Sequence, residues 1–531
     1  MSFPLSFPLT ALNKAQLVCV ALVLLLASAV LSSLRHYPRA WRATETPVTF
    51  WAWRNQAPAA ADVSAAIEQT KARAIFLRAG QIDIQDRKLR RIRSVTGPLP
   101  RSIDLHLVYN ATRSLLAQLE QVNETALADT ISASYLTDIA LAERAGSRVI
   151  GLQVDIDVPT RLLGRYEKIL GALRRRLPPQ TKLSITGLPT WMESTELVRV
   201  LAQVDFWIPQ LYGAEIPQRS DQLIPISSVR SVSRSVSQVR KLDKPFYAGL
   251  AAYSYTLLYG SSGSLVTLRG DMDPALIVSD RNLRLIDQRP FDSQQSATNG
   301  LLTSSEWRSI YRVTADGVID DLALHAGDVL VVDQPSAESL RVAARAVREL
   351  AGEKLLGICV FRLAGVDDPA TLTIAQVASA LADRDSLANV DVKILSDTQN
   401  LSVNQTASTA WILKVKNTGT AGSTIGSVKV DLQTTPGTIE IRGPESLSSL
   451  EFLCDRGNET SQTNREPCSQ RRANVIRFKP RILAPGQTVQ AQLVMNPGSL
   501  RAIPVSVEMQ TDTGQWYRER LEVAVEGSTK Q

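Results

Sequence analysis

The stretch VIGLQVDIDV, residues 149–158, decides the fold class. Side chains alternate along a β-strand, so one face of this run is polar and the other is apolar. The polar face comprises Gln153, Asp155 and Asp157. The apolar face comprises Leu152, Val154 and Ile156. An apolar face suits a covering layer of helices, so we expect the polar face to point into the lumen of a barrel.

Seven other short apolar runs alternate with stretches of helical spacing. That rhythm predicts βα units around a parallel sheet. The eight runs are residues 48–53, 74–77, 103–109, 149–158, 183–188, 206–212, 246–253 and 356–363. Eight such runs match a closed (β/α)8, TIM-like barrel of the α/β class.

About a hundred residues separate the seventh run from the eighth, which is too long for one helix and its loops. The segment GDVLVVDQPS, residues 327–336, predicts an extra strand that enters a helix with Ser336 as its N-cap. An extra strand there could displace the eighth run from the barrel. Residues 260–303 are rich in Ser, Gly, Asp and Asn, which predicts surface loops over the barrel mouth.

From about Asp385 the pattern changes to alternating runs split by Gly, Pro, Asn and Ser. Such a pattern predicts an all-β, immunoglobulin-like sandwich of about seven or eight strands. A chain of 531 residues is also too long for one core. We therefore expect a leader and linker over residues 1–45, a barrel over 46–384 and a sandwich over 385–531.

Residues 15–34 carry no charge and are just long enough to cross a bilayer as a helix. Lys14 precedes them, and Ala27-Ser28-Ala29 matches a small-residue cleavage pattern, so both a signal peptide and a membrane anchor fit. Three arginines follow the segment and favour a cytoplasmic body: Arg35, Arg39 and Arg42. A predicted disulfide between Cys454 and Cys468, which flank a polar loop, instead favours export to the cell envelope.

The composition is that of a globular protein, with 44% hydrophobic and 21% charged residues, and it excludes disorder and a multi-span membrane protein. Basic residues are densest at residues 87–93 and 174–176. We interpret them as solvated helix faces, with an anionic partner as the alternative. No aromatic residues interleave with them, so no nucleic acid is expected. Three histidines make a metal site improbable, and no cofactor is expected.

Active sites of such barrels lie at the carboxyl ends of the strands. The negative charges of Asp155 and Asp157 would repel each other there. This repulsion raises the pKa of one of the two carboxyl groups, which suits general acid–base catalysis. The alternative is a structural pair held by neighbouring strands. Candidate ligand-binding residues are Gln210, Tyr212 and Arg362, together with aromatic rings that could stack on sugars: Trp53, Trp191 and Tyr253. Ordinary packing is the alternative for each of them.

These residues resemble the family-18 glycoside hydrolases, whose fourth strand carries D-x-x-D-x-D-x-E and whose sixth carries M-x-Y-D. Asp155 and Asp157 fit the second and third Asp, and Tyr212 fits the Tyr. Pro159 stands where the catalytic Glu would be, so that mechanism does not carry over. The segments 184–191 and 204–210 also resemble an uncharacterised bacterial family, domain-of-unknown-function family 3142, over roughly residues 46–363. This second resemblance implies the fold and export.

Two hypotheses follow. The chain is a glycosidase-like enzyme with Asp157 as the acid, Asp155 tuning its pKa, and Glu193 or Glu215 as the second carboxylate that hydrolysis needs. Alternatively, it is an inactive barrel that binds a glycan or a partner at the cell envelope. Both predict a carbohydrate polymer as the ligand, and both place the chain outside the cytoplasm, tethered through its N-terminal helix.

Overall fold

The computed structural model describes the following residues of the chain: 45–213, 215–272, 276–277, 280–290, 306–365, 368, 370–384, 389–396, 409–419, 423–430, 440–442, 448–454, 471–478, 482–483, 488–495, 502–511 and 516–526. The predicted leader, residues 15–34, lies outside them. None of the helices that the described residues form is long and apolar enough to cross a membrane.

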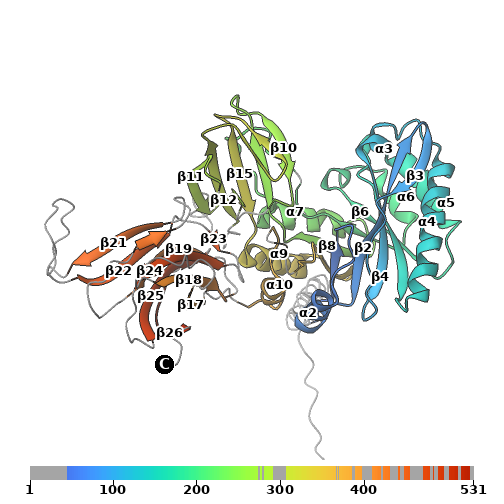
Figure 1. Ribbon diagram of the computed structural model, residues 1–531. Helices are drawn as coiled ribbons and strands as arrows, with labels where there is room; N and C mark the ends of the chain where they lie inside the picture. The colour runs from blue at the N-terminus through green and yellow to red at the C-terminus, as the bar shows by residue number, and fades with distance from the viewer. Residues whose placement is uncertain are drawn as a thin grey trace, which may run out of the picture.

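Eight parallel strands close into a barrel (Figure 1). They are β1 (Val48–Ala52), β2 (Ala74–Gln85), β4 (Asp104–Ala111), β5 (Val149–Asp155), β6 (Lys182–Gly187), β7 (Phe206–Pro209), β8 (Phe246–Ala251) and β16 (Leu355–Phe361). Closure comes from β1, which pairs with β16 on one side and β2 on the other. All eight predicted runs are barrel strands, and the eighth run keeps its place.

Helices follow the strands and cover the outside of the barrel (Figure 1). They are α2 (Ala60–Thr70), α3 (Arg113–Ala117), α4 (Glu124–Arg144), α5 (Leu163–Arg174), α6 (Leu197–Ala202), α7 (Val229–Arg240), α9 (Ala337–Leu350) and α10 (Ile374–Leu381). Two 3-10 turns, η1 (Thr160–Leu162) and η2 (Pro189–Trp191), precede α5 and α6. Ser336 caps α9 as predicted, because its hydroxyl accepts the backbone N–H of Ser339.

The lower lumen is filled with side chains. Trp51, Phe76, Phe206 and Cys359 belong to one buried cluster there. His106 stacks on Phe76 with the ring centroids 4.5 Å apart. Burial lowers the pKa of His106 to about 3, so the ring is neutral and serves the packing. Because these side chains fill the lower lumen, we expect a ligand to bind at the carboxyl ends of the strands.

A second sheet is inserted between β8 and α9. Its strand order is β10-β9-β15-β12-β11. The bounds are β9 (Tyr255–Tyr259), β10 (Leu265–Arg269), β11 (Leu283–Pro290), β12 (Trp307–Val313) and β15 (Val329–Gln334), with a hairpin of β13 (Gly317–Ile319) and β14 (Leu322–Leu324). The predicted extra strand is β15, and it joins this sheet rather than the barrel. The expectation of loops over 260–303 is wrong where β10 and β11 form.

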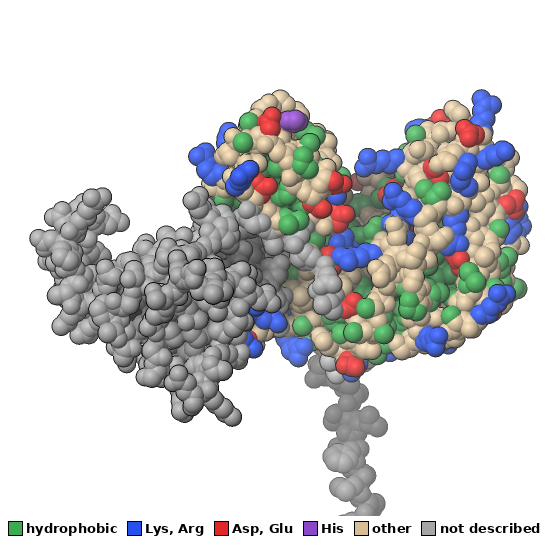
Figure 2. All heavy atoms as spheres, in the orientation of Figure 1, with side chains coloured by type: hydrophobic (Ala, Val, Ile, Leu, Met, Phe, Trp, Pro, Cys, Tyr) green, Lys and Arg blue, Asp and Glu red, His purple; other side chains and the backbone are tan. Residues whose placement is uncertain are grey.

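A hollow opens between the inserted sheet and the part of the barrel that carries α3 and β3 (Lys88–Ile92), as Figure 2 shows. Strand β3 pairs antiparallel with the last part of β2, from Gln81 to Gln85. The basic residues 87–93 therefore lie on a hairpin, which corrects their interpretation as a helix face. Arg91 anchors the hairpin to α4 by an ion pair of 2.7 Å with Asp138.

The C-terminal part forms antiparallel strands and, in its described residues, no helix. The strands are β17 (Val390–Ser396), β18 (Thr409–Asn417), β19 (Ser423–Val430), β20 (Glu440–Arg442), β21 (Ser448–Cys454), β22 (Arg471–Phe478), β23 (Ile482–Leu483), β24 (Thr488–Met495), β25 (Ala502–Thr511) and β26 (Trp516–Glu526). One parallel pairing, between β17 and β26, joins the two antiparallel groups. Cys468, half of the predicted disulfide, lies outside the described residues.

Candidate active site

Asp155 is the last residue of β5 and lies on the lumen face, as predicted. Its carboxylate accepts a hydrogen bond of 2.5 Å from the hydroxyl of Thr186 on β6. Burial and the neighbouring charge of Asp157 raise the pKa of Asp155 to about 7, against the smaller opposite effects of Thr186 and Arg78. One carboxyl group in the mouth of the barrel can therefore hold a proton near neutral pH.

Asp157 lies in the loop that leaves β5 and is exposed. The N–H of Val158 donates to the carbonyl of Ile156 over 2.7 Å, which makes Asp157 the central residue of a three-residue turn. Although the residue is exposed, the atoms around its carboxyl group partly desolvate that group and raise the pKa of Asp157 as well. The exposed side chain can meet a ligand directly, while Asp155 stays behind it.

Gln153 lies below the aspartates on the same face of β5 and is fully buried. Its side-chain oxygen accepts a hydrogen bond of 2.6 Å from the indole N–H of Trp51. The amide nitrogen has no hydrogen-bond partner among the described residues. This contact fixes the orientation of the amide and closes the floor of the mouth.

An aromatic wall rises on the side of β7, β8 and β16. Tyr212 stacks on Phe361 with centroids 6.1 Å apart, and Tyr253 meets both rings edge-on. Tyr212 is buried and Tyr253 half-buried, and burial raises the pKa of both hydroxyls. The structure thus brings Tyr212 and Tyr253 together beside the aspartates, whose charges act on Tyr212. Gln210 is half-buried after β7.

Arg78, which was not among the residues predicted for the site, lies on β2 and is 9% exposed. Its Nε donates to the side-chain oxygen of Asn110 over 3.3 Å, and its guanidinium covers the ring of Trp53 at 5.0 Å. Asn110 in turn pairs in register with Asp155. The available signal was its spacing: Arg78 is two residues after Phe76 and so shares its lumen face.

Trp191 does not lie where it could stack on a sugar, as the sequence had suggested. It is fully buried under the helix layer, where its ring packs edge-on against Tyr166. Its indole N–H donates to the carbonyl of Val158 over 2.8 Å. Trp191 therefore holds the loop that carries Asp157 and is not accessible for stacking on a sugar.

Arg362 is also engaged within the protein. It is 7% exposed and makes two hydrogen bonds to Asp368, of 2.9 and 3.0 Å. A third bond reaches the carbonyl of Gly270. These contacts tie β16 to the inserted segment, so Arg362 has a structural role instead of the expected ligand contact.

Glu193 and Glu215 are exposed in the loops after β6 and β7. Neither is among the groups whose charge alters the pKa of Asp155 or Asp157. The charge effects on the pair thus include no contribution from either glutamate among the described residues. Nor do those residues contain a group of three or more His, Cys, Asp or Glu side chains that could hold a metal ion.

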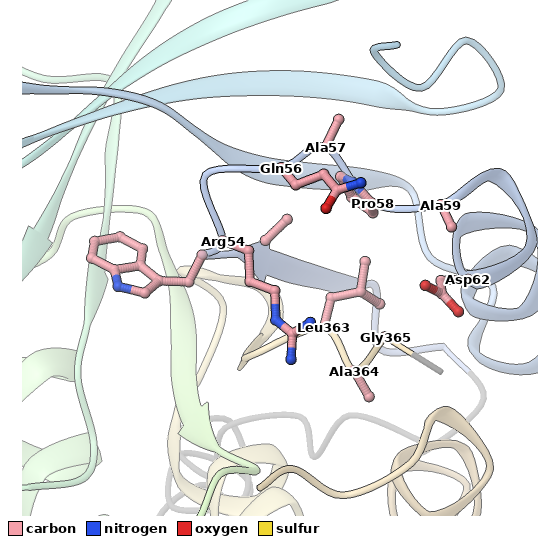
Figure 3. Close-up of a pocket in the computed structure, with 11 residues that line it drawn as sticks. Arg54, Gln56, Ala57, Pro58, Ala59, Asp62, Leu363, Ala364 and Gly365 are labelled. Carbon is pink, nitrogen blue, oxygen red and sulfur yellow. The ribbon is translucent and has the colours of Figure 1, made fainter. Parts of the chain in front are cut away.

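A side pocket of about 210 Å³ adjoins the mouth between the segments that follow β1 and β16 (Figure 3). Arg54, Gln56 and Asp62 contribute polar side chains to its lining, and Leu363 and Ala364 contribute apolar ones. Arg54 also forms an ion pair of 3.3 Å with Asp368. Trp53 lines this pocket, and Arg78 covers the Trp53 ring. The pocket therefore extends the mouth of the barrel beyond Trp53.

The fold and the mouth together define a (β/α)8 barrel with an acidic pair at the carboxyl end of β5. Residues 111–286 match the model of a family described as "Domain of unknown function (DUF3142)". The predicted resemblance to that family is thereby confirmed for this segment, which contains both aspartates. A comparison with curated proteins finds no match.

Several solved structures match the chain at low sequence identity. A chitinase from Chromobacterium violaceum ATCC 12472 is 15% identical, with 64% of this chain and 100% of that chain covered and a TM-score of 0.40. The spore cortex-lytic enzyme SleL of Bacillus cereus is 14% identical, with 64% and 74% covered and a TM-score of 0.39. A family-18 N-acetylglucosaminidase from Paenibacillus barengoltzii is 13% identical, with 63% and 99% covered and a TM-score of 0.37. These values are too low to transfer a site or an activity.

Proposed function

We propose that the barrel is a glycoside-hydrolase-like enzyme that acts on a glycan in the mouth, with Asp155 and Asp157 at the active centre. The observation that carries this proposal is the acidic pair: burial and the charge of Asp157 raise the pKa of Asp155 to about 7, and burial raises the pKa of Asp157. A protonated carboxyl group at neutral pH is what a leaving glycosidic oxygen requires. The aromatic wall of Tyr212, Tyr253 and Phe361 supports a sugar ligand.

In this mechanism Asp157, the exposed member, donates a proton to the glycosidic oxygen as the bond from that oxygen to the anomeric carbon breaks. Asp155 keeps the proton on the pair, because two charges so close together repel each other. A water molecule then adds its oxygen to the anomeric carbon and returns a proton to the pair. Trp191 maintains the position of Asp157 through the carbonyl of Val158.

The test is hydrolysis of a panel of bacterial and plant polysaccharides by the full chain. We expect Asp157→Asn to lower the rate by at least about 100-fold, since general acid catalysis contributes that much or more. The control is Asp243→Asn. Asp243 precedes β8, and its exposed carboxylate pairs with Lys354, so this change should leave the rate unchanged. Full activity in Asp157→Asn would show that the acid is another residue.

A second function, an inactive glycan-binding barrel, is favoured by one specific observation. Pro159 replaces an acid at the end of the β5 loop, and neither Glu193 nor Glu215 acts on the pair. On this hypothesis Asp155→Ala weakens binding to a glycan array, while no released sugar is detected from either protein. A product peak from pure wild-type protein would exclude this function.

We also propose that the chain is exported and works at the cell envelope, tethered through residues 15–34, with an immunoglobulin-like C-terminal module. The uncharged leader and the pair Cys454 and Cys468 support this location. Labelling of thiols in the native chain before and after reduction tests it. Equal labelling in both states would argue against the disulfide.

A further inference from the structure

The guanidinium of Arg78 lacks the partners that other buried arginines of the chain have. Among the described residues, four arginines are at least as buried, and each donates to two or more acceptor atoms: Arg308, Arg341, Arg348 and Arg362. Arg78 donates through Nε alone, and no described carboxylate lies within 4.0 Å of it. Buried charges are normally paired, so this exception needs an explanation.

The surroundings of Arg78 fix its orientation. The ring of Trp53 covers one face of the guanidinium, and the Asn110 amide oxygen binds its Nε edge. The two terminal nitrogens, which form the other edge, have no hydrogen bond to a described residue. Asp155, whose charge raises the pKa of Arg78, accepts a hydrogen bond from Thr186.

A second arginine increases the positive charge at this place. Arg93, exposed after β3, lowers the pKa of Arg78 by repulsion, in addition to the larger effect of burial. Figure 2 shows Lys and Arg side chains on the barrel side of the hollow. Two like charges that act on each other, neither with a described carboxylate within 4.0 Å, form a site for an anionic group.

We propose that Arg78, supported by Trp53 and Arg93, binds a carboxylate carried by a sugar of the glycan, so that the substrate class is an acidic, carboxylated glycan. The proposal rests on the proposed function and specifies its ligand. A planar guanidinium with two parallel donors matches a planar carboxylate in a bidentate pair. The sugar ring would lie between this anchor and the aromatic wall, next to Asp157.

The experiment measures binding to the full chain by calorimetric titration. One probe is an oligogalacturonate, whose carboxylate is on the ring, and another is an oligosaccharide of N-acetylmuramic acid, whose carboxylate is on a lactyl ether. Each is compared with its carboxyl-reduced, neutral counterpart. We expect wild type to bind at least one carboxylated probe about tenfold or more tightly than its neutral form, because a charge-assisted pair contributes that much.

Arg78→Met should abolish this preference for the carboxylated probe. Arg78→Lys should retain part of it, because lysine keeps the positive charge but lacks the two parallel donors of a guanidinium. Arg144→Met, at the exposed end of α4, removes the same charge away from the mouth and should keep the full preference. Arg93→Met, an exposed change that leaves the fold intact, should reduce the preference by a smaller factor.

Stability separates a ligand-binding role from a structural one. Because Arg78 is buried without a carboxylate, ligand-free Arg78→Met should melt at or above the wild-type temperature, whereas a structural arginine would lower it on removal. Equal binding of charged and neutral probes by wild type would overturn the carboxylate proposal and leave the glycan function standing. Failure of every probe to bind would overturn both.

Discussion

The barrel mouth and the base of the inserted sheet both combine buried acids with an arginine, but they satisfy these charges differently. At the base of the sheet, Arg308 makes hydrogen bonds of 2.6 and 2.7 Å to both carboxylate oxygens of Asp333. Glu306 accepts the backbone N–H groups of Ile226 and Ser227. In the mouth, Arg78 and the pair of aspartates stay apart.

The difference teaches which charges hold the fold and which are kept for a ligand. The contacts of Glu306 and Arg308 fasten the loop after β7 to the inserted sheet, since Arg308 also donates to the carbonyl of Gln222. Every charge there has a partner within the protein. In the mouth, Arg78, Asp155 and Asp157 form no ion pair of 4.0 Å or less with a described residue, and charges without an ion pair are typical of functional sites.

The largest effect on stability is expected from Arg308→Met. The change leaves the carboxylate of Asp333, which is 0% exposed, without its cation and should cost about 3–5 kcal/mol of unfolding free energy. Denaturant unfolding measures it. Arg269→Met, which breaks exposed ion pairs in the same sheet, is the matched control and should have a much smaller effect. Equal losses would mean that the buried pair is not special.

A smaller, pH-dependent effect is expected from Asp155→Asn. The folded chain keeps a proton on Asp155 up to about pH 7, whereas the unfolded chain loses it near 3.8. Between these values the folded state binds more protons, so its stability falls as the pH rises. Removing the carboxylate should make the variant less sensitive to pH, by up to about 3 kcal/mol at pH 7 relative to pH 4.

Urea unfolding at several pH values measures this difference. Glu306 and Asp333, whose pKa values burial also raises, contribute equally to wild type and variant and cancel in the comparison. Asp243→Asn should retain the wild-type profile. Parallel profiles for wild type and Asp155→Asn would show that Asp155 titrates normally and would remove the main support for the proposed acid.

The smallest effect is expected from Tyr255→Phe at the base of the inserted sheet. The hydroxyl of Tyr255 is buried with no hydrogen-bond partner among the described residues, so its removal should be neutral or stabilise by up to about 1 kcal/mol. Tyr109→Phe, which loses a hydrogen bond of 2.5 Å to Asp138, should instead cost about 1.5–3 kcal/mol. Thermal unfolding compares the two. A loss in Tyr255→Phe would reveal an unrecognised partner.

The sequence predicts the barrel well, because buried parallel strands are continuous apolar runs whose number and spacing can be counted. The inserted sheet was only partly predictable. Strands β10 and β11 lie among Ser, Gly and Asn residues and have exposed side chains such as Val266, so their pattern resembles that of loops. Only β15, with its run of Val and Leu, gave a clear signal.

The sequence predicts the part of the site that lies on β5, because side chains alternate between the two faces of a strand. Gln153 and Asp155 lie on the expected face because a strand fixes the direction of its side chains. Trp191 follows β6 in a 3-10 turn, where no such rule applies, and it points under the helices. Arg78 was overlooked because a charged residue at the end of an apolar run resembles a strand terminus.

The closure of the barrel has a consequence for how the chain folds. Val48 on β1 pairs with Ile358 on β16, so the ring joins residues more than three hundred positions apart. During synthesis, seven strands and the whole inserted sheet emerge before the closing strand exists, and β1 keeps an unpaired edge throughout that time. Contacts so distant in sequence slow folding and expose the edge to other chains. The order of the strands therefore requires that the unpaired edge of β1 be protected from other chains until β16 has been synthesised.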